Sequence, residues 1–175
     1  DVLLLNIANE AGGGVESNFE SAYTDAIGRI RNKDIHCPLV IDADRWGRNV
    51  QQLLDSGPAL LQSDPDKNCI FSWHAWDANQ PKSVYSTAIA SAIEKNICLI
   101  IGEFAHKEVG CRCCIDYNYI LEICEEKRIG WLAWSWGTAH NGDCGEMDMT
   151  DGGSFDALSG WGLEVATTDP NSIKN

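Results

Sequence analysis

The stretch LLLNIANE, residues 3–10, is a short apolar run that ends on a carboxylate. A glutamate is seldom buried unless it is paired, so its place at the end of an apolar run needs an explanation. Short apolar runs without clean alternation are typical of parallel strands that are buried on both faces. The sequence predicts five such strands, because four similar runs follow: PLVIDAD (38–44), CIFSWHAW (69–76), ICLIIGEF (97–104) and GWLAWSW (130–136).

Helical patterns lie between the predicted strands. Ser17 and Glu20 form a predicted capping box for the first helix. Ser83 is the predicted cap of a second helix, and Gly130 is the predicted stop signal after a third. Strands that alternate with helices indicate right-handed β-α-β units. The apolar stripes of the three helices are Phe19, Tyr23, Ile27 and Ile30; Val84, Ala88, Ala92 and Ile93; and Tyr117, Ile120, Leu121 and Cys124.

One polar or aromatic residue near the end of each predicted strand marks a repeat: Glu10, Asp42, His74, Glu103 and Trp134. These positions are separated by 32, 32, 29 and 31 residues, which is the size of one β-α unit. Eight such units need about 250 residues, the usual length of a (β/α)₈ barrel, and the chain has 175. Catalytic groups of that fold collect at the carboxyl ends of the strands, which explains why a leucine run ends on Glu10.

We therefore predict an α/β fold of the (β/α)₈ TIM-barrel type, in which residues 1–175 form a single partial barrel domain of about five β/α units. A doubly wound open sheet is the alternative. No G-x-G-x-x-G follows any predicted strand, and two carboxylates at strand ends suit that fold less well.

Five parallel strands cannot close a barrel of normal geometry, because strand number, tilt and stagger are linked. The strands at 3–10 and 130–136 would therefore expose backbone edges. Three explanations stay open: the chain is a fragment of a longer enzyme, it pairs with a second copy, or a different chain supplies the upstream half. We expect a homo-oligomer or a missing N-terminal half to cover these edges.

Composition excludes several classes of partner. The formal net charge of −13 argues against nucleic acid and anionic membrane surfaces. No apolar run approaches the roughly 18 residues of a membrane span. The seven tryptophans offer flat faces on which sugar rings stack, although core packing is the default for most of them. No signal peptide is visible, but the chain begins with Asp, almost inside a predicted strand, so we expect that an upstream segment has been removed. We also expect the protein to be secreted.

The eight cysteines show no paired C-x-x-C zinc pattern. An even number of cysteines in a protein predicted to be exported favours some disulfides. Cys37 and Cys69 each precede a strand and are candidate neighbours, while Cys144 is a candidate partner for the cysteines of the loop at 111–114. The connectivity stays open. Plain buried thiols are the alternative for two further positions, Cys98 and Cys124.

Two of the strand-end residues are glutamates, Glu10 and Glu103, which we expect to face one another across the mouth of the barrel. Such a pair can hydrolyse a glycosidic bond: one carboxyl protonates the leaving oxygen while the other attacks or activates water. A separation of about 5–5.5 Å gives retention through a covalent glycosyl-enzyme, and a larger gap gives inversion. The plainer interpretation is two surface glutamates at strand ends. Their occurrence together with His74 and several tryptophans favours the glycosidase.

The motifs NIANE, FSWHAW, LIIGEF and WLAWSWG, in this order and spacing, resemble the later strands of glycoside hydrolase family 5. The likeness is greatest to the bacterial endo-β-1,4-mannanases of that family. It includes LVIDADRWG and the closing DMT and SIKN, and it extends over nearly the whole chain. The resemblance implies that the chain corresponds to strands four to eight of the barrel. It also implies an endo-acting, retaining hydrolase of β-1,4-linked polysaccharide, with mannan as the favoured substrate.

The resemblance also implies a role for each matching residue. Glu10 is the implied acid/base and Glu103 the implied nucleophile. Asn9 would hydrogen-bond the sugar 2-hydroxyl, and His74 would hold the polar network around the glutamates, with a satisfied core histidine as the alternative. Trp134 resembles the platform under the sugar in the subsite before the cleavage point.

Three other tryptophans complete the predicted substrate-binding set. Trp46 and Trp136 are weaker candidates, for which packing is the alternative. Trp76 stands where the family usually has a tyrosine whose hydroxyl bonds the nucleophile, and an indole N–H can donate too, but from a different place. The first three strands have no counterpart in the chain, and with them goes the second-strand arginine that normally braces the nucleophile.

Other interpretations stay open. The dense tryptophans and the change at Trp76 leave an endo-β-1,4-glucanase (cellulase) as the alternative to a mannanase. A catalytically impaired, carbohydrate-binding half barrel is a second alternative. We expect no cofactor and no metal. A metal-binding interpretation of the loop NGDCGEMDMTDGG does not match EF-hand spacing, so a solvated active-site loop is the default; its acidic residues are Asp143, Glu146, Asp148 and Asp151.

Overall fold

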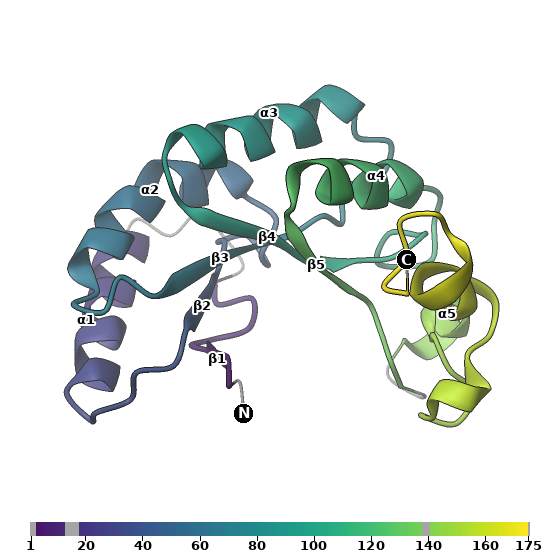
Figure 1. Cartoon of the computed structure of the whole chain (residues 1–175), viewed down its shortest axis with the longest axis horizontal. Helices are drawn as coiled ribbons and strands as arrows, with labels where there is room; N and C mark the ends of the chain where they lie inside the picture. Colours follow the sequence, from purple (N-terminus) through teal and green to yellow (C-terminus); the bar gives the residue numbers. More distant parts are fainter. Residues whose placement is uncertain (1–2, 13–17, 138–140, 175) are drawn as a thin grey trace. The chain divides into compact units, whose positions relative to one another are not determined.

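Strands and helices alternate along most of the chain in the computed structural model, which describes residues 3–12, 18–137 and 141–174 (Figure 1). The strands are β1 (Leu5–Asn6), β2 (Leu39–Asp42), β3 (Cys69–His74), β4 (Cys98–Phe104) and β5 (Gly130–Ala133). The connecting helices are α1 (Phe19–Arg31), α2 (Val50–Ser63), α3 (Lys82–Glu94) and α4 (Tyr117–Lys127). After β5 the chain forms short helical turns at Gly142–Met147, Phe155–Ala157, Gly160–Leu163 (α5) and Glu164–Thr168. None of the helices in the described ranges is long and apolar enough to cross a membrane.

The strands follow one another in the sheet in the order β1-β2-β3-β4-β5. The β1–β2 and β2–β3 pairs are parallel, and Leu39 lies opposite both Leu5 and Cys69. A doubly wound sheet reverses its strand order at a switch point, and this order has no reversal. The predicted fold class, a partial (β/α)₈ barrel of five β/α units, is therefore confirmed.

The described residues form two compact units. Unit 1 contains the chain up to Ala75 together with Ser86–Gly102, and unit 2 contains Trp76–Tyr85 together with the chain from Glu103 onward. The prediction that residues 1–175 form a single domain stays a prediction.

Unit 1 is built on β2 and β3, with α1 and α2 packed beside them (Figure 1). All four residues of β2 are buried, as expected for a strand covered on both faces. The predicted stripe of α1 is confirmed for Phe19, Tyr23 and Ile27, which are buried, whereas Ile30 is half-buried. The predicted cap Ser17 lies outside the described residues, and Asn18 precedes the helix without a side-chain capping bond.

A buried ion pair ties the amino-terminal ends of β2 and β3 together. Arg31 at the end of α1 donates two hydrogen bonds to the Asp64 carboxylate, each 2.8 Å long, and two more to the carbonyl oxygens of Ile35 and Cys37. Asp64 is fully buried and also accepts the backbone N–H of Asn68. The hydrogen bonds from Arg31 hold the pKa of the Asp64 carboxyl well below its usual range, against the effect of burial. This pair lies at the amino-terminal ends of the strands, the side of a β/α barrel whose residues serve stability and not catalysis.

Unit 2 is held by aromatic packing. The Trp161 ring contacts Phe104 and Tyr117 edge-on, with ring centroids 5.9 and 5.1 Å apart. Ile120 and Leu121 of α4 are fully buried, which confirms the centre of the predicted stripe. Edge-to-face contacts of this kind contribute about 0.5–1.5 kcal/mol each beyond the area that they bury.

The predicted cap of α3 was wrong, whereas the predicted end of α4 is confirmed. Ser83 does not cap α3, because that helix already includes Lys82. The predicted stripe of α3 is confirmed for Ala88 and Ala92, which are buried, but Ile93 is exposed; Tyr85 and Ile89, which the stripe did not include, are buried. In α4 the helix ends at Lys127 as predicted, but Arg128, with φ of +56°, forms the left-handed cap in place of glycine.

The structure pairs Cys111 with Cys144, whose Cα atoms are 5.3 Å apart, and the adjacent Cys113 with Cys114. Cys144 therefore lies beside the loop that the sequence predicted for it. Cys37 and Cys69 are free thiols and do not form the candidate pair. The prediction of plain thiols holds for the other two free cysteines, although Cys98 is exposed and only Cys124 is buried.

Candidate active site

Glu10 lies in unit 1, four residues after the end of β1, so the strand is shorter than predicted, and its backbone has an unusual conformation. Its φ is +50°, in the left-handed region that a glutamate seldom adopts. The Glu10 backbone N–H donates to Asp42 Oδ2 over 3.0 Å. The side chain is 29% exposed, and its Oε1 lies 3.0 Å from His74 Nδ1. The carboxyl group is therefore open to solvent on one side and held by an imidazole on the other.

His74 and Asp42, at the carboxyl ends of β3 and β2, form the buried side of this network. The His74 side chain is 2% exposed and Asp42 is fully buried. His74 Nε2 lies 3.4 Å from Asp42 Oδ2. Burial alone would raise the pKa of Asp42, but the hydrogen bond and charge of His74 and the Glu10 N–H together lower it. Asp42 therefore stays ionised.

Unit 2 carries the second glutamate. Glu103 lies on β4, and its Oε2 accepts the indole N–H of Trp76 over 3.0 Å. Trp76 is buried and meets Trp134 edge-on, with ring centroids 6.3 Å apart. The tryptophan that replaces the family's usual tyrosine thus does donate to Glu103.

Trp134, at the end of β5, is fixed by polar contacts at both ends. Its indole N–H donates to Asn141 Oδ1 over 2.5 Å, and its carbonyl oxygen accepts the indole N–H of Trp161 over 3.1 Å. Asn141 in turn donates to Ser135 and Asp148. The ring is half-buried and held at a fixed angle, which a stacking platform requires.

The remaining predicted binding residues lie nearer the surface. Trp46, in the loop after β2, is 55% exposed, and Trp136 is 45% exposed with its indole N–H bonded to the carbonyl oxygen of Gly153. Asn9 is exposed beside Glu10. In unit 1 the structure brings Glu10 and His74 together, and in unit 2 it brings together Glu103 and two tryptophans.

The acidic loop at 141–153 is occupied by internal contacts. Glu146 forms an ion pair with Lys107, whose hydrogen bond lowers the pKa of Glu146. Asp148 accepts from Asn141. The side chain of Asp143 lies outside what the structure describes. The default interpretation, a solvated active-site loop, stays a prediction.

Sequence reasoning missed two residues of these networks. Asp42 stood in the 32-residue repeat of strand-end side chains, but it was given no role. That repeat was the signal that could have identified it. Asn141 had no comparable signal, because it lies in a loop whose contacts depend on the fold of unit 2.

Residues 1–140 match the family model described as "Cellulase (glycosyl hydrolase family 5)". The chain belongs to glycosyl hydrolase family 5. Among curated relatives, the mannan endo-1,4-beta-mannosidase of Salipaludibacillus agaradhaerens is 32% identical over 167 residues, covering 94% of this chain and 53% of that protein. A second mannan endo-1,4-beta-mannosidase, from Streptomyces lividans, is 28% identical over 170 residues, covering 94% of this chain and 43% of that protein.

Solved structures agree with this assignment. The mannotriose complex of Thermomonospora fusca beta-mannanase superposes with a TM-score of 0.85 at 28% identity, covering 98% of this chain and 56% of that one. The chain therefore spans about half the length of the relatives and structures that it matches. The predicted kinship with bacterial β-mannanases is confirmed.

Proposed function

We propose that the chain supplies the two catalytic carboxyl groups of an endo-acting, retaining β-1,4-mannanase, with Glu10 as acid/base and Glu103 as nucleophile. The observation that carries the proposal is the hydrogen bond between Glu10 and His74, an ionisable partner that is backed by a buried carboxylate. Such surroundings suit a carboxyl that must lose and regain a proton within one turnover.

In the proposed reaction Glu103 attacks the anomeric carbon as the bond to the glycosidic oxygen breaks, and Glu10 gives its proton to that oxygen. Glu10 then takes a proton from water, the water oxygen attacks the same carbon, and the bond to Glu103 breaks. The proposal requires the two carboxyl groups to lie about 5–5.5 Å apart. Asn9 would bind the 2-hydroxyl, Trp134 would lie under the sugar, and the exposed rings of Trp46 and Trp136 would extend the cleft.

Mannan is the first proposed substrate, because the relatives named above are mannosidases of this polymer. A cellulase is the second candidate. It is favoured by a relative named "Beta-mannanase/endoglucanase A" from Caldicellulosiruptor saccharolyticus, which is 27% identical over 176 residues, covering 98% of this chain and 12% of that protein.

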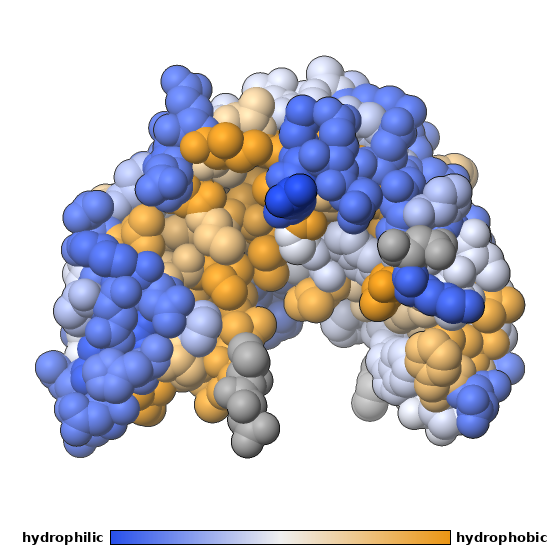
Figure 2. All heavy atoms as spheres, viewed as in Figure 1, coloured by the Kyte–Doolittle hydropathy of each residue, from blue (hydrophilic) through white to orange (hydrophobic). Residues whose placement is uncertain are grey.

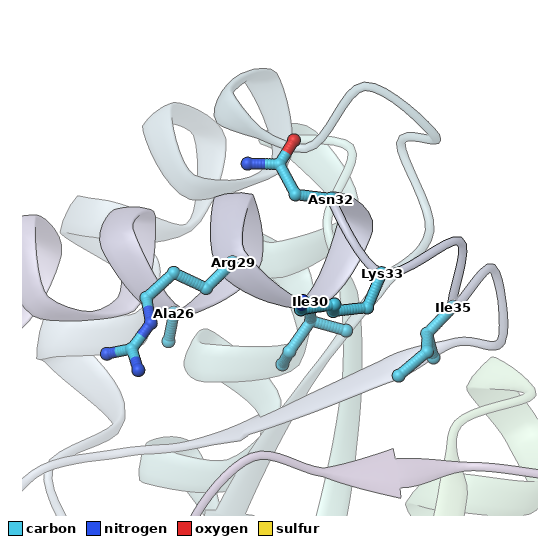
Figure 3. Close-up of a pocket in the computed structure, with 6 residues that line it drawn as sticks. All are labelled: Ala26, Arg29, Ile30, Asn32, Lys33 and Ile35. Carbon is cyan, nitrogen blue, oxygen red and sulfur yellow. The ribbon is translucent and has the colours of Figure 1, made fainter.

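A second copy of the chain is the proposed partner. Leu3 and Leu4, beside the edge strand β1, are 67% and 49% exposed, and Figure 2 shows apolar side chains gathered on one face of unit 1. A hollow of about 550 Å³ beside the end of α1 combines Ile30 and Ile35 with the cations Arg29 and Lys33 (Figure 3). Light scattering tests this proposal: a dimer supports it, and a stable monomer contradicts it.

An extracellular location is proposed as well. The Cα separation of Cys111 and Cys144 suits a disulfide, and such bonds persist in oxidising compartments. Mass spectrometry of the natural protein after alkylation of free thiols is the test, and a free Cys144 would contradict it.

Reducing-sugar release from mannan and from carboxymethyl-cellulose tests the activity. The wild-type chain is expected to release sugar from mannan, and Glu103→Gln is expected to bind mannan without hydrolysing it. Glu122→Gln, an exposed glutamate on α4, is the matched control and should keep full activity. A folded wild-type chain that binds mannan but releases no sugar would favour the carbohydrate-binding alternative.

A further inference from the structure

Asp42 lies where two parts of the Glu10 environment meet. It is the last residue of β2 and is fully buried. Its Oδ2 accepts the Glu10 backbone N–H at 3.0 Å and lies 3.4 Å from His74 Nε2. The side-chain amide of Asn6 also lies 3.4 Å from each Asp42 oxygen. The Asp42 carboxylate therefore contacts both the main chain of Glu10 and His74, the residue that faces the Glu10 side chain.

The first contact concerns the backbone. A residue other than glycine in the left-handed region is strained and persists there only when its surroundings hold it. Glu10 has φ of +50°, and Asp42 Oδ2 accepts its N–H. A hydrogen bond to an ionised acceptor is stronger than one between neutral groups, so the contact with Asp42 can offset that strain. Asp42 thus fixes the direction in which the Glu10 side chain leaves the main chain.

The second contact concerns the proton of His74. An ionised carboxylate offers only acceptors, so the ring nitrogen that faces Asp42 carries hydrogen. The other nitrogen, Nδ1, then faces Glu10 Oε1 at 3.0 Å. In a neutral ring Nδ1 is an acceptor, and it can receive a hydrogen bond only from a protonated Glu10. The acid form of Glu10 is therefore the form that this arrangement stabilises.

The His74 ring is not free to turn away from this position. Its backbone N–H donates to the carbonyl oxygen of Gly47 over 2.7 Å. A Cβ on Gly47 would lie 2.4 Å from the ring, so the backbone at Gly47 packs directly against the imidazole. Packing sets the plane of the ring, and Asp42 sets which nitrogen carries the proton.

We propose that Asp42 is a positioning residue for the acid step: it holds the Glu10 backbone and, through His74, presents an accepting nitrogen to the Glu10 carboxyl. This inference rests on the proposed function in assigning the acid role to Glu10. The spectroscopic test below needs no turnover, so the two can fail independently.

The kinetic test compares two mannosides in wild type and Asp42→Asn. The amide keeps the shape of Asp42 but offers the ring one acceptor and one donor, so the ring is no longer held with its proton on Nε2. Hydrolysis of mannan, whose leaving group needs protonation, is expected to fall about 10²-fold in kcat. The rate of the initial burst of dinitrophenolate from an aryl β-mannobioside, a step that needs no acid, is expected to fall no more than about threefold. Equal losses on the two substrates, or no loss on mannan, would overturn the proposal.

Asp64→Asn is the matched control, because Asp64 is equally buried in unit 1 but lies at the opposite ends of the strands. Asp64→Asn should lower the free energy of unfolding, but the ratio of mannan hydrolysis to dinitrophenolate release per folded molecule should stay as in wild type. The second measurement is the imidazole ¹⁵N spectrum of wild-type His74, which shows directly which nitrogen is protonated. A neutral ring with its proton on Nε2 is expected. A proton on Nδ1, in a neutral ring or in an imidazolium, or a mixture of tautomers, would overturn the proposal whether or not the chain hydrolyses mannan.

Discussion

The two candidate catalytic glutamates have contrasting hydrogen-bond partners. In unit 1, Glu10 faces the imidazole of His74, which can give or accept a proton. In unit 2, Glu103 accepts from the indole of Trp76, which can only donate and does not ionise. A carboxyl that is protonated in one step and ionised in the next needs the first kind of partner. A nucleophile that must stay ionised needs the second kind.

The scaffolds of the two units differ in the same sense. Unit 1 places charged groups inside, with the Arg31–Asp64 pair at one end of the strands and Asp42 at the other. Unit 2 relies on the rings around Trp161. Removing one partner of a buried charge leaves the other charge uncompensated, which is strongly destabilising. Removing one ring from an aromatic cluster leaves the contacts among the other rings in place. We therefore expect unit 1 to be the more sensitive to single charge changes.

The largest expected effect separates the two glutamates by role. Glu103→Gln should lower hydrolysis of mannan and of a dinitrophenyl β-mannobioside alike, by more than about 10⁴-fold, because no nucleophile remains. Glu10→Gln should lower mannan hydrolysis by about 10²–10⁴-fold but leave the initial burst of dinitrophenolate nearly intact. Steady-state and burst kinetics measure both. Identical behaviour of the two variants would remove the contrast.

The next effect tests the scaffold of unit 1. Arg31→Met leaves Asp64 buried without its cation, which costs about 3–5 kcal/mol of unfolding free energy. Urea denaturation, with amide hydrogen exchange to localise the change to β2 and β3, measures this loss. The double variant Arg31→Met/Asp64→Asn should recover part of it, because the uncompensated charge is gone. A double variant no more stable than the single one would contradict the importance of the buried charge.

A smaller effect tests the partner of Glu103. Trp76→Phe keeps an aromatic ring but removes the N–H donor, and a hydrogen bond to a charged group is worth about 1.5–3 kcal/mol. We expect kcat/KM on both mannosides to fall by about 10–100-fold, because the ionised nucleophile loses its donor. Trp76→Tyr should lose less if its hydroxyl reaches the carboxylate. Wild-type rates in Trp76→Phe would show that the indole N–H is not needed.

The smallest effect concerns acid. The folded-state pKa of Asp64 is lowered, so its contribution to stability is present above the unfolded value of about 3.9 and is lost as pH falls below it. Between pH 5 and pH 3 this carboxyl should account for a loss of about 1 kcal/mol. Urea midpoints at the two pH values should differ less in Asp64→Asn than in wild type. An equal change in both would show that other carboxyls dominate the acid sensitivity.

The sequence predicted the fold because the β/α repeat places one strand-end side chain about every thirty residues, from Glu10 to Trp134. The resemblance to family 5 also implied that His74, the last residue of β3, and Trp76, two residues later, lie near the glutamates. Helix ends were less predictable: Arg128 caps α4 through a backbone conformation that pattern alone does not reveal.

The role of Asp42 was not predictable for a related reason. Its contacts depend on the left-handed turn at Glu10, and a strand-end aspartate is compatible with several geometries. The pairing of Cys144 with one member of a crowded cysteine loop likewise depends on loop conformation, which sequence spacing leaves open.

A covalent trapping experiment addresses the division of labour between the two glutamates most directly. A 2-deoxy-2-fluoro-mannosyl donor with a good leaving group should accumulate as an ester, and mass spectrometry of the digested protein should locate it on Glu103. Glu10, whose partner exchanges protons, should remain unlabelled. A label on Glu10, or turnover of the donor without any ester, would contradict this account.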